Sequence, residues 1–273
     1  MLMIDIREQW FQTIRKKTFR AAISTEEPGI LSGTAEAAAR MEEIGATLEW
    51  KRFEGDAVRA GDVLGILSGS PVAVARAEES VLGTLMKASG IATAAAKAVA
   101  AAEGRAQIVS GGWKKMPPDC KKMVRQAVCT GGALFRICEP PMLYMDKNIL
   151  RMFGSVSEAL QSCRCFPEAA RIVQIHGVTG PVEEEIRQAA EGGVSVCMVD
   201  TGRIEDMRLC DAILRQQGLR GQVRVAFAGN LKIADIAALR DEPVDLLDIG
   251  KEIIDAPLLN MKLDVLTESE ALR

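Results

Sequence analysis

The sequence predicts an α/β protein in which a parallel sheet closes as a barrel and a small α+β unit precedes it. Two observations favour this fold. From about residue 107 onward, apolar or β-branched runs alternate with helical patterns, and the last four runs begin 22 to 28 residues apart, the length of one strand–helix unit. Such units form a parallel sheet, and this sheet can close into a barrel. In the first hundred residues, short strands are instead separated by Gly-Asp turns.

The first domain, which we expect to span residues 1–105, begins with an amphipathic helix over residues 1–19. Short strands follow within 48–71, and then a long Ala-rich helical stretch from Pro71 to about Ala102. The small side chains on the surface of these helices permit close helix packing, either in the core or at an oligomer contact.

The second domain is expected to span residues 106–273 as the barrel. Its clearest strands are the runs at 171–176, 194–200, 222–229 and 244–250. Helical patterns separate them. In the first of these helices, Pro181 suits the opening turn and Gly192 the end.

The composition excludes several classes of protein. The net charge is -3, the pI is about 5.5, and Lys and Arg are scattered, which argues against a nucleic acid or an anionic membrane as partner. The charged N-terminal stretch lacks the apolar core of a signal peptide, and no run is long enough to span a bilayer. Seven cysteines without a CxxC pair indicate reduced thiols, and we therefore expect a cytoplasmic protein.

Four strings occur in the order and spacing of one known family: GDAVRAGDVLGILSG at 55–69, AEESVLGTLMKASGIAT at 77–93, AVCTGG at 127–132 and DLLDIGKEI at 245–253. The chain resembles the quinolinate phosphoribosyltransferases, also called nicotinate-nucleotide pyrophosphorylases. The resemblance implies an incomplete α/β barrel with an N-terminal open sandwich, partly completed by C-terminal residues. It also implies a homodimer whose subunits share the active site.

The reaction that this resemblance implies joins quinolinate to phosphoribosyl pyrophosphate with Mg²⁺ and releases pyrophosphate and CO₂. Both substrates are polyanions, so such a site needs cations. At the family's carboxylate-binding Arg, this chain has Glu79, which reverses the charge. At the family's TRKT strand end it has Trp113, Lys114 and Lys115, which keep two cations and add an aromatic face.

The next two motifs also depart from the family. Where the family has a histidine before its arginine, this chain has Phe135 followed by Arg136, which implies that only the arginine's role is kept. At the position of a donor-binding lysine stands Asp146, with Lys147 one residue along. A one-residue slip in a strand would point Lys147 to the opposite face, unless a bulge compensates.

The following two strands carry the remaining polar candidates. The family's alternating glutamates become Gln174 and His176, the only histidine of the chain. Asp200 is kept at a strand end, where barrel sites lie, and the resemblance implies that it holds Mg²⁺. We expect His176 to be either a structural residue with its hydrogen bonds made within the protein or an acid or base in the reaction.

A phosphate site is expected at the loop Ala228-Gly229-Asn230, with Asn230 capping the next helix, and at Gly250. The substitutions make the site roughly three to four units less positive than the family's. We therefore expect a phosphoribosyltransferase that uses Lys115, Arg136, His176 and Asp200 on a substrate other than quinolinate. The alternatives are a different reaction on the same barrel and a non-catalytic small-molecule-binding protein.

Overall fold

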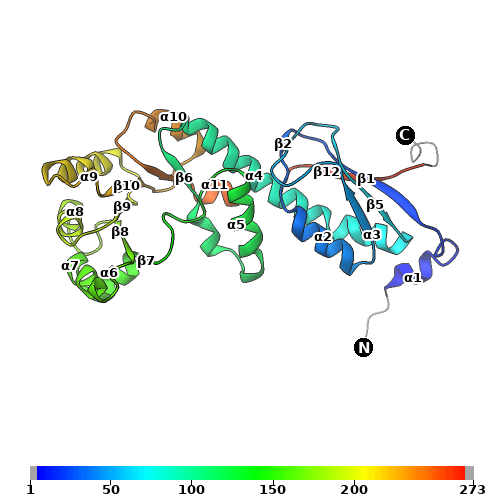
Figure 1. Ribbon diagram of the computed structural model, residues 1–273, viewed down its shortest axis with the longest axis horizontal. Helices are drawn as coiled ribbons and strands as arrows, with labels where there is room; N and C mark the ends of the chain where they lie inside the picture. Colours follow the sequence, from blue (N-terminus) through cyan, green and yellow to red (C-terminus); the bar gives the residue numbers. More distant parts are fainter. Residues whose placement is uncertain (1–4, 268–273) are drawn as a thin grey trace. The chain divides into compact units, whose positions relative to one another are not determined.

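The computed structural model describes residues 5–267, and these form two compact units (Figure 1). The first unit takes the residues up to Ala96, Met116–Gly132 and those from Asp255 on, and the second takes Lys97–Lys115 and Ala133–Ile254. This division into compact units differs from the boundary expected after residue 105, which stays a prediction. The segment 116–132 belongs to the first unit because its helix packs tightly there: a Cβ on Gly131 would lie 2.3 Å from the carbonyl oxygen of Ala92.

The first unit contains an antiparallel sheet of four strands in the order β12-β1-β5-β3. The strands are β1 (Phe19–Thr25), β3 (Thr47–Trp50), β5 (Val63–Gly69) and β12 (Met261–Val265), with a separate pair β2 (Gly29–Ile30) and β4 (Ala57–Val58). Because β12 pairs with β1, residues near the C-terminus contribute an edge strand to this sheet. The helices are α1 (Ile6–Trp10), α2 (Thr34–Glu43), α3 (Pro71–Ser80), α5 (Lys121–Thr130) and the part of α4 (Leu82–Ala102) up to Ala96.

The Ala-rich stretch forms helices as predicted. Ser70 caps α3 by accepting a hydrogen bond from the backbone N–H of Ala73, and Val81 separates α3 from α4. Val81, Leu85 and Ala77 are fully buried in the core of the first unit. The small side chains of this stretch are therefore core, as one of the two interpretations had it.

The helix predicted over residues 1–19 is wrong in its length, because α1 covers only Ile6–Trp10. Residues 1–4 of the predicted helix lie outside the described residues. No side chain of α1 is buried, so packing does not extend the helix, and a short helix gains little on its own. It is held by its cap, in which Asp5 accepts from the N–H of Arg7, and by the ion pair of Asp5 with Arg76.

The second unit contains a parallel sheet of six strands in the order β6-β11-β10-β9-β8-β7. The strands are β6 (Gln107–Val109), β7 (Met142–Met145), β8 (Ala170–Ile175), β9 (Val196–Val199), β10 (Arg224–Phe227) and β11 (Leu246–Asp248). This is the cyclic order of a barrel that stays open between β6 and β7, so the predicted incomplete barrel is confirmed. Leu134 lines part of the opening, since its N–H donates to Ile108 and its carbonyl accepts from Ser110.

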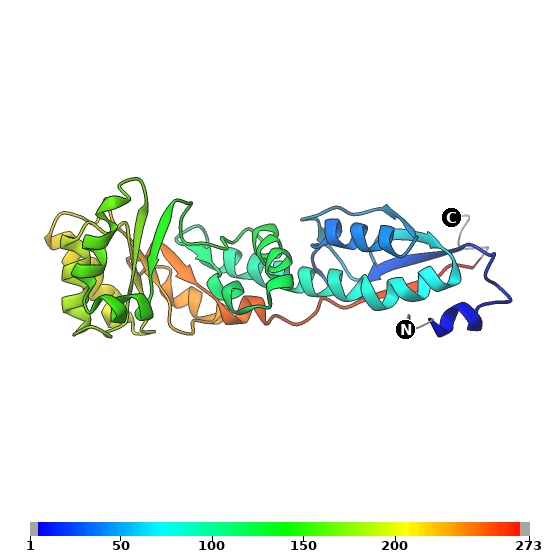
Figure 2. The ribbon, with the colours of Figure 1, turned by 90° about the horizontal axis from the view of Figure 1, so that it is seen from below.

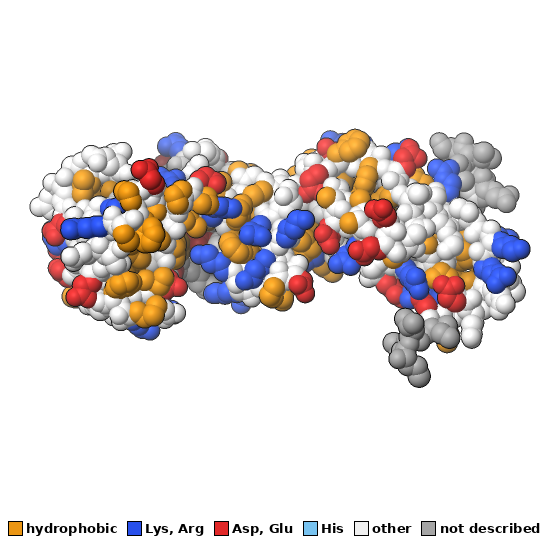
Figure 3. Space-filling view, turned by 60° about the horizontal axis from the view of Figure 1, so that its bottom comes forward, with side chains coloured by type: hydrophobic (Ala, Val, Ile, Leu, Met, Phe, Trp, Pro, Cys, Tyr) orange, Lys and Arg blue, Asp and Glu red, His pale blue; other side chains and the backbone are white. Residues whose placement is uncertain are grey.

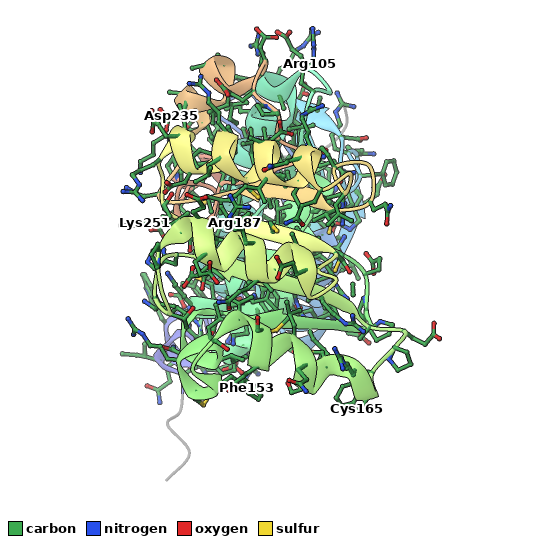
Figure 4. All side chains as sticks on the ribbon, turned by 90° about the vertical axis from the view of Figure 1, so that its left-hand side faces the viewer. Arg105, Phe153, Cys165, Arg187, Asp235 and Lys251 are labelled. Carbon is green, nitrogen blue, oxygen red and sulfur yellow. The ribbon has the colours of Figure 1, made fainter. Side chains whose placement is uncertain are left out.

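Helices cover the outer face of this sheet (Figures 1 and 2). They are α6 (Lys147–Phe153), α7 (Val156–Ser162), α8 (Val182–Glu191), α9 (Ile204–Gln216), α10 (Ile236–Leu239) and α11 (Lys251–Ile254). The 3₁₀ turns of this unit are η1 (Gly111–Lys115), η3 (Cys163–Cys165) and η4 (Ile233–Asp235), whereas η2 (Pro118–Cys120) belongs to the first unit. Figure 4 shows α9, α8 and the pair α6–α7 side by side as one layer. The barrel interior is apolar and includes Ile172, Met198, Ala226 and Leu246.

On the face drawn in Figure 3, side chains of both charges are mixed, with Lys and Arg gathered toward the middle of the view. Among residues 5–267, no helix is both long enough and apolar enough to cross a membrane.

Candidate active site

The candidate site lies at the carboxyl ends of the parallel strands of the second unit. Side chains alternate along a strand, and Ile172, Met198 and Leu246 point into the barrel core. The next inward positions, two residues on, are therefore Gln174, Asp200 and Asp248. Polar side chains thus replace apolar ones where the barrel interior meets the rim.

Gln174 links three strand ends. Its Nε2 donates to Oδ2 of Asp200, and its Oε1 accepts from the backbone N–H of Lys147 at 2.8 Å. These two contacts fix the amide, because only its nitrogen can donate and only its oxygen can accept. The structure therefore brings Gln174 and Asp200 together, as the sequence predicted.

The expected placement of Asp146 and Lys147 in a strand is wrong, and no bulge is needed. Asp146 follows β7 and caps α6, since its Oδ1 accepts from the N–H groups of Asn148 and Ile149 at 2.9 and 3.0 Å. Lys147 is the first residue of the helix and is exposed; it contacts Gln174 through its backbone, not its ammonium. The charge of Asp146 is thus used by the helix.

His176 directly follows β8 and is exposed. Its Nδ1 lies 2.5 Å from the carbonyl oxygen of Asp200. The backbone N–H of His176 donates to Oε2 of Glu185 at 3.0 Å. Both the ring and the backbone of this histidine are therefore held by neighbouring groups.

Asp248 is a site residue that sequence reasoning missed. Its Oδ1 accepts from the N–H of Gly111 at 3.2 Å. Burial, and then the nearby charge of Asp200, raise the pKa of Asp248 to about 6, although the hydrogen bond from Gly111 and the charges of Lys114 and Lys115 act in the opposite direction. The signal was available, since Asp248 lies two residues after the inward Leu246.

Lys114 and Lys115 lie on η1, after β6, near these carboxylates. Nζ of Lys114 lies 4.2 Å from the centre of the Tyr144 ring, a cation–π contact. Burial, and then the charges of the aspartates of the rim, raise the pKa of the Tyr144 hydroxyl well above its ordinary value. The two predicted lysines are thus at the rim with Asp248, and Tyr144 joins them.

Trp113 and Arg136 both contact Phe135. The indole Nε1 of Trp113 donates to the carbonyl oxygen of Phe135 at 2.5 Å, and the two rings meet edge to face at 6.1 Å. The guanidinium carbon of Arg136 lies 4.2 Å from the centre of the Phe135 ring. Trp113 therefore packs on the segment beside β6, and Arg136 on the same aromatic ring.

The predicted cap by Asn230 is wrong. Asn230 has a left-handed φ of 63°, and the N–H groups at the start of η4 are capped by other carboxylates. Asp235 accepts from Lys232 at 2.8 Å, and Glu252 accepts from Ile233 at 2.6 Å. The sequence could not reveal Glu252, because it comes from the following strand–helix unit.

Gly229 is required by packing. It has φ of 118°, and a Cβ there would lie 2.1 Å from the backbone nitrogen of Gly202. Gly250 closes the neighbouring loop, where its carbonyl oxygen accepts from the hydroxyl of Ser110 at 3.4 Å. The close contact between loops accounts for Gly229 without any phosphate.

Glu79 lies on α3 in the first unit and is paired. Its Oε2 is 2.8 Å from the guanidinium of Arg7. The negative charge predicted at this position is therefore offset by the neighbouring cation of Arg7, which the sequence did not indicate as a partner.

The residues present are compatible with the Mg²⁺ that the resemblance implies at Asp200. Within residues 5–267, no group of three or more His, Cys, Asp and Glu is placed to hold a metal ion. Mg²⁺, however, is commonly held by one or two carboxylates together with substrate phosphates. Asp200, with one oxygen bound to Gln174, fits that type of site.

The fold and the rim define an α/β-barrel protein whose site lies at the carboxyl ends of its strands, with an additional α+β unit. Residues 5–89 match the model for the quinolinate phosphoribosyl transferase N-terminal domain, and residues 91–264 match the model for the C-terminal domain. The chain belongs to the quinolinate phosphoribosyl transferase family, a family of transferase enzymes.

Individual relatives agree with this assignment. A probable nicotinate-nucleotide pyrophosphorylase (carboxylating) of Archaeoglobus fulgidus is 27% identical over 255 residues, covering 93% of this chain and 96% of the relative. The human nicotinate-nucleotide pyrophosphorylase (carboxylating) is 24% identical over 254 residues, covering 92% and 84%. The solved structure of the nicotinate-nucleotide pyrophosphorylase from Francisella tularensis has the same fold, with a TM-score of 0.83 at 21% identity over 97% of this chain and 91% of that one.

Proposed function

We propose that this chain is a phosphoribosyltransferase whose acceptor is a small molecule other than quinolinate. The observation that supports it is the charge of the rim. The carboxylate of Asp248 lies near Asp200, Lys114 and Lys115, and Gln174 and His176 are the polar groups that contact Asp200. Two cations beside two carboxylates suit a dianionic acceptor poorly, and they suit an acceptor with fewer carboxylates or with an amine.

The donor in this proposal is phosphoribosyl pyrophosphate. Lys114, Lys115 and Arg136 would bind its anionic groups, and Asp200 would hold Mg²⁺, which supplies charge neutralisation for the departing pyrophosphate. Trp113, Lys147 and Glu79 would bind substrate at the edge of the site. The loops at Gly229, Asn230 and Gly250 would take the phosphate of the ribose.

We further propose a homodimer in which the first unit of one subunit, with Glu79 and Arg7, completes the site of the other. The ion pair of these two residues means that an approaching carboxylate would meet a neutral pair and not a free glutamate. Binding at this point would therefore depend on Arg7 as well as on Glu79.

The test is calorimetric titration of the purified protein with phosphoribosyl pyrophosphate and with quinolinate, each with Mg²⁺, followed by assay of the mixture for pyrophosphate and nicotinate mononucleotide. We expect the donor to bind and quinolinate not to be turned over. Formation of nicotinate mononucleotide would overturn the proposal and make this a nicotinate-nucleotide pyrophosphorylase. The variant Glu79→Arg gives the matched control, because it should improve quinolinate binding if charge is what limits it.

One observation favours a second candidate, a small-molecule-binding protein without transferase activity. The N–H groups of Lys232 and Ile233, at the loop where a phosphate is proposed, already donate to Asp235 and Glu252. A phosphate would have to displace these carboxylates. Absence of binding by both donor and quinolinate in the titration would favour this second candidate.

A further inference from the structure

A buried carboxylate that the proposed reaction does not use lies directly behind His176. Glu185, on the first turn of α8, is only 1% exposed. Its two oxygens accept five hydrogen bonds from one loop: from the N–H groups of His176, Gly177, Val178 and Thr179, and from the Thr179 hydroxyl, at 2.7 to 3.0 Å. The whole turn after β8 is therefore wrapped around a single charged group.

This arrangement is more than a satisfied loop. Burying a carboxylate is costly unless every lone pair is used, and here backbone N–H groups converge on it as they do in anion-binding nests. The neighbouring glutamates of the same helix, Glu183 and Glu184, are exposed and pair only along the helix. The buried one is distinguished by what it holds, which is the backbone of His176 and the three residues after it.

The ring of His176 is fixed from the other side. Its Nδ1 faces the carbonyl oxygen of Asp200, which can only accept a hydrogen bond, so Nδ1 must carry the proton. Nε2 of the neutral ring then has a free lone pair, and among residues 5–267 it makes no hydrogen bond. The histidine thus presents an acceptor, and not a donor, at the exposed rim.

We propose that Glu185 is a positioning residue that holds His176 in the Nδ1–H tautomer, so that Nε2 accepts a hydrogen bond from an N–H or O–H group of the acceptor substrate. The use of Nε2 for substrate rests on the proposed function; the tautomer and the role of Glu185 do not. A substrate with such a donor is recognised because a molecule without it would leave this acceptor unpaired when water is excluded.

The first test needs no variant, because the chain contains a single histidine. In ¹⁵N-labelled, untagged protein, the two-bond and three-bond correlations of the imidazole identify which nitrogen is protonated in the neutral ring. We expect the proton on Nδ1. A proton on Nε2 would overturn the proposal, whatever the outcome of the titrations with phosphoribosyl pyrophosphate.

The second test measures hydrogen exchange of the backbone amides of residues 176–179 in the same sample. Each is expected to exchange about 100-fold or more slowly than in an unstructured peptide, because each donates to a buried carboxylate. Exchange of all four at the unstructured rate would show that Glu185 does not hold the loop.

The variant Glu185→Gln then tests whether the hydrogen bonds of Glu185 to the loop determine the tautomer of His176. Its amide keeps one accepting oxygen and turns an NH₂ group toward the loop donors, so we expect the amides of 176–179 to lose protection and the imidazole to show both tautomers. Glu184→Gln on the same helix makes the same change of charge at an exposed position and should leave both signals unchanged. A folded Glu185→Gln protein with an unchanged Nδ1–H tautomer would refute the positioning role.

Discussion

Replacing Asp248 by asparagine tests the electrostatics of the rim directly. The carboxyl group is largely buried beneath η1, and its pKa is raised from an ordinary 3.8 to about 6, first by burial and then by the charge of Asp200. Asparagine has the same shape, and its Oδ1 can still accept from the N–H of Gly111. The substitution therefore removes the titration and little else.

The direction in which stability changes with pH depends on whether the folded or the unfolded state binds the proton of Asp248 more tightly. Between about pH 4 and pH 6 the folded protein keeps a proton on Asp248 that the unfolded chain releases, so this group's contribution to stability falls as the pH rises through that window. A shift of about two pKa units corresponds to about 3 kcal/mol. Asp248→Asn should therefore be about as stable as the wild type near pH 4 and about 2–3 kcal/mol more stable above pH 7.

Urea denaturation at several pH values, in the presence of a chelator and followed by circular dichroism, measures this difference. Asp241→Asn, at an exposed position of the same unit, controls for the change of residue type and should follow the wild type at every pH. The contrary result is an Asp248→Asn variant no more stable than the wild type above pH 7, or a difference in free energy of unfolding that does not decrease on acidification. Either result would show that the charged form of Asp248 does not destabilise the folded protein, which would refute the raised pKa.

Three further outcomes are expected. Gly229→Ala should lose more than about 3 kcal/mol of stability or fail to fold, since its Cβ would meet another loop's backbone, whereas Gly221→Ala, with open space around it, should change the denaturation midpoint little. Glu54→Gln should lose about 1–3 kcal/mol, because this carboxylate accepts the hydrogen bonds that cap α2, and Glu43→Gln, on an exposed face, should lose little in the same urea titration. Lys114→Gln should weaken binding of phosphoribosyl pyrophosphate by roughly tenfold in calorimetry, and unchanged affinity would remove this lysine from the site.

The sequence predicted the barrel well because its signal is local. The runs that became β8 to β11 are apolar and are separated by helices of the expected length, so their order and direction followed from the chain alone. The placement of Gln174, His176 and Asp200 at one edge followed as well, since carboxyl ends of parallel strands meet there. In the structure, hydrogen bonds link Gln174 and His176 to Asp200.

What the sequence did not predict depends on partners far along the chain. Asp248 is a rim residue because Gly111, 137 residues earlier, donates to it and because loops bury it. The cap at η4 comes from Glu252, and Glu79 is offset by Arg7. The alternation along the strand marks Asp248 as an inward position, but in all three cases no local pattern identifies the tertiary neighbour that decides the chemistry of the charged side chain.

Several of the loops at the rim use the chain's own carboxylates to satisfy their backbone N–H groups. Asp146 caps α6, Glu185 fills the turn after β8, and Asp235 and Glu252 cap η4. Backbone N–H groups that could have bound a phosphate are therefore already paired at these loops. A phosphorylated ligand must then rely on the lysines of η1 and on a metal ion, or displace a carboxylate at a cost in affinity. A steep dependence of donor binding on Mg²⁺ would follow from the first route, and weak binding that is insensitive to Mg²⁺ from the second.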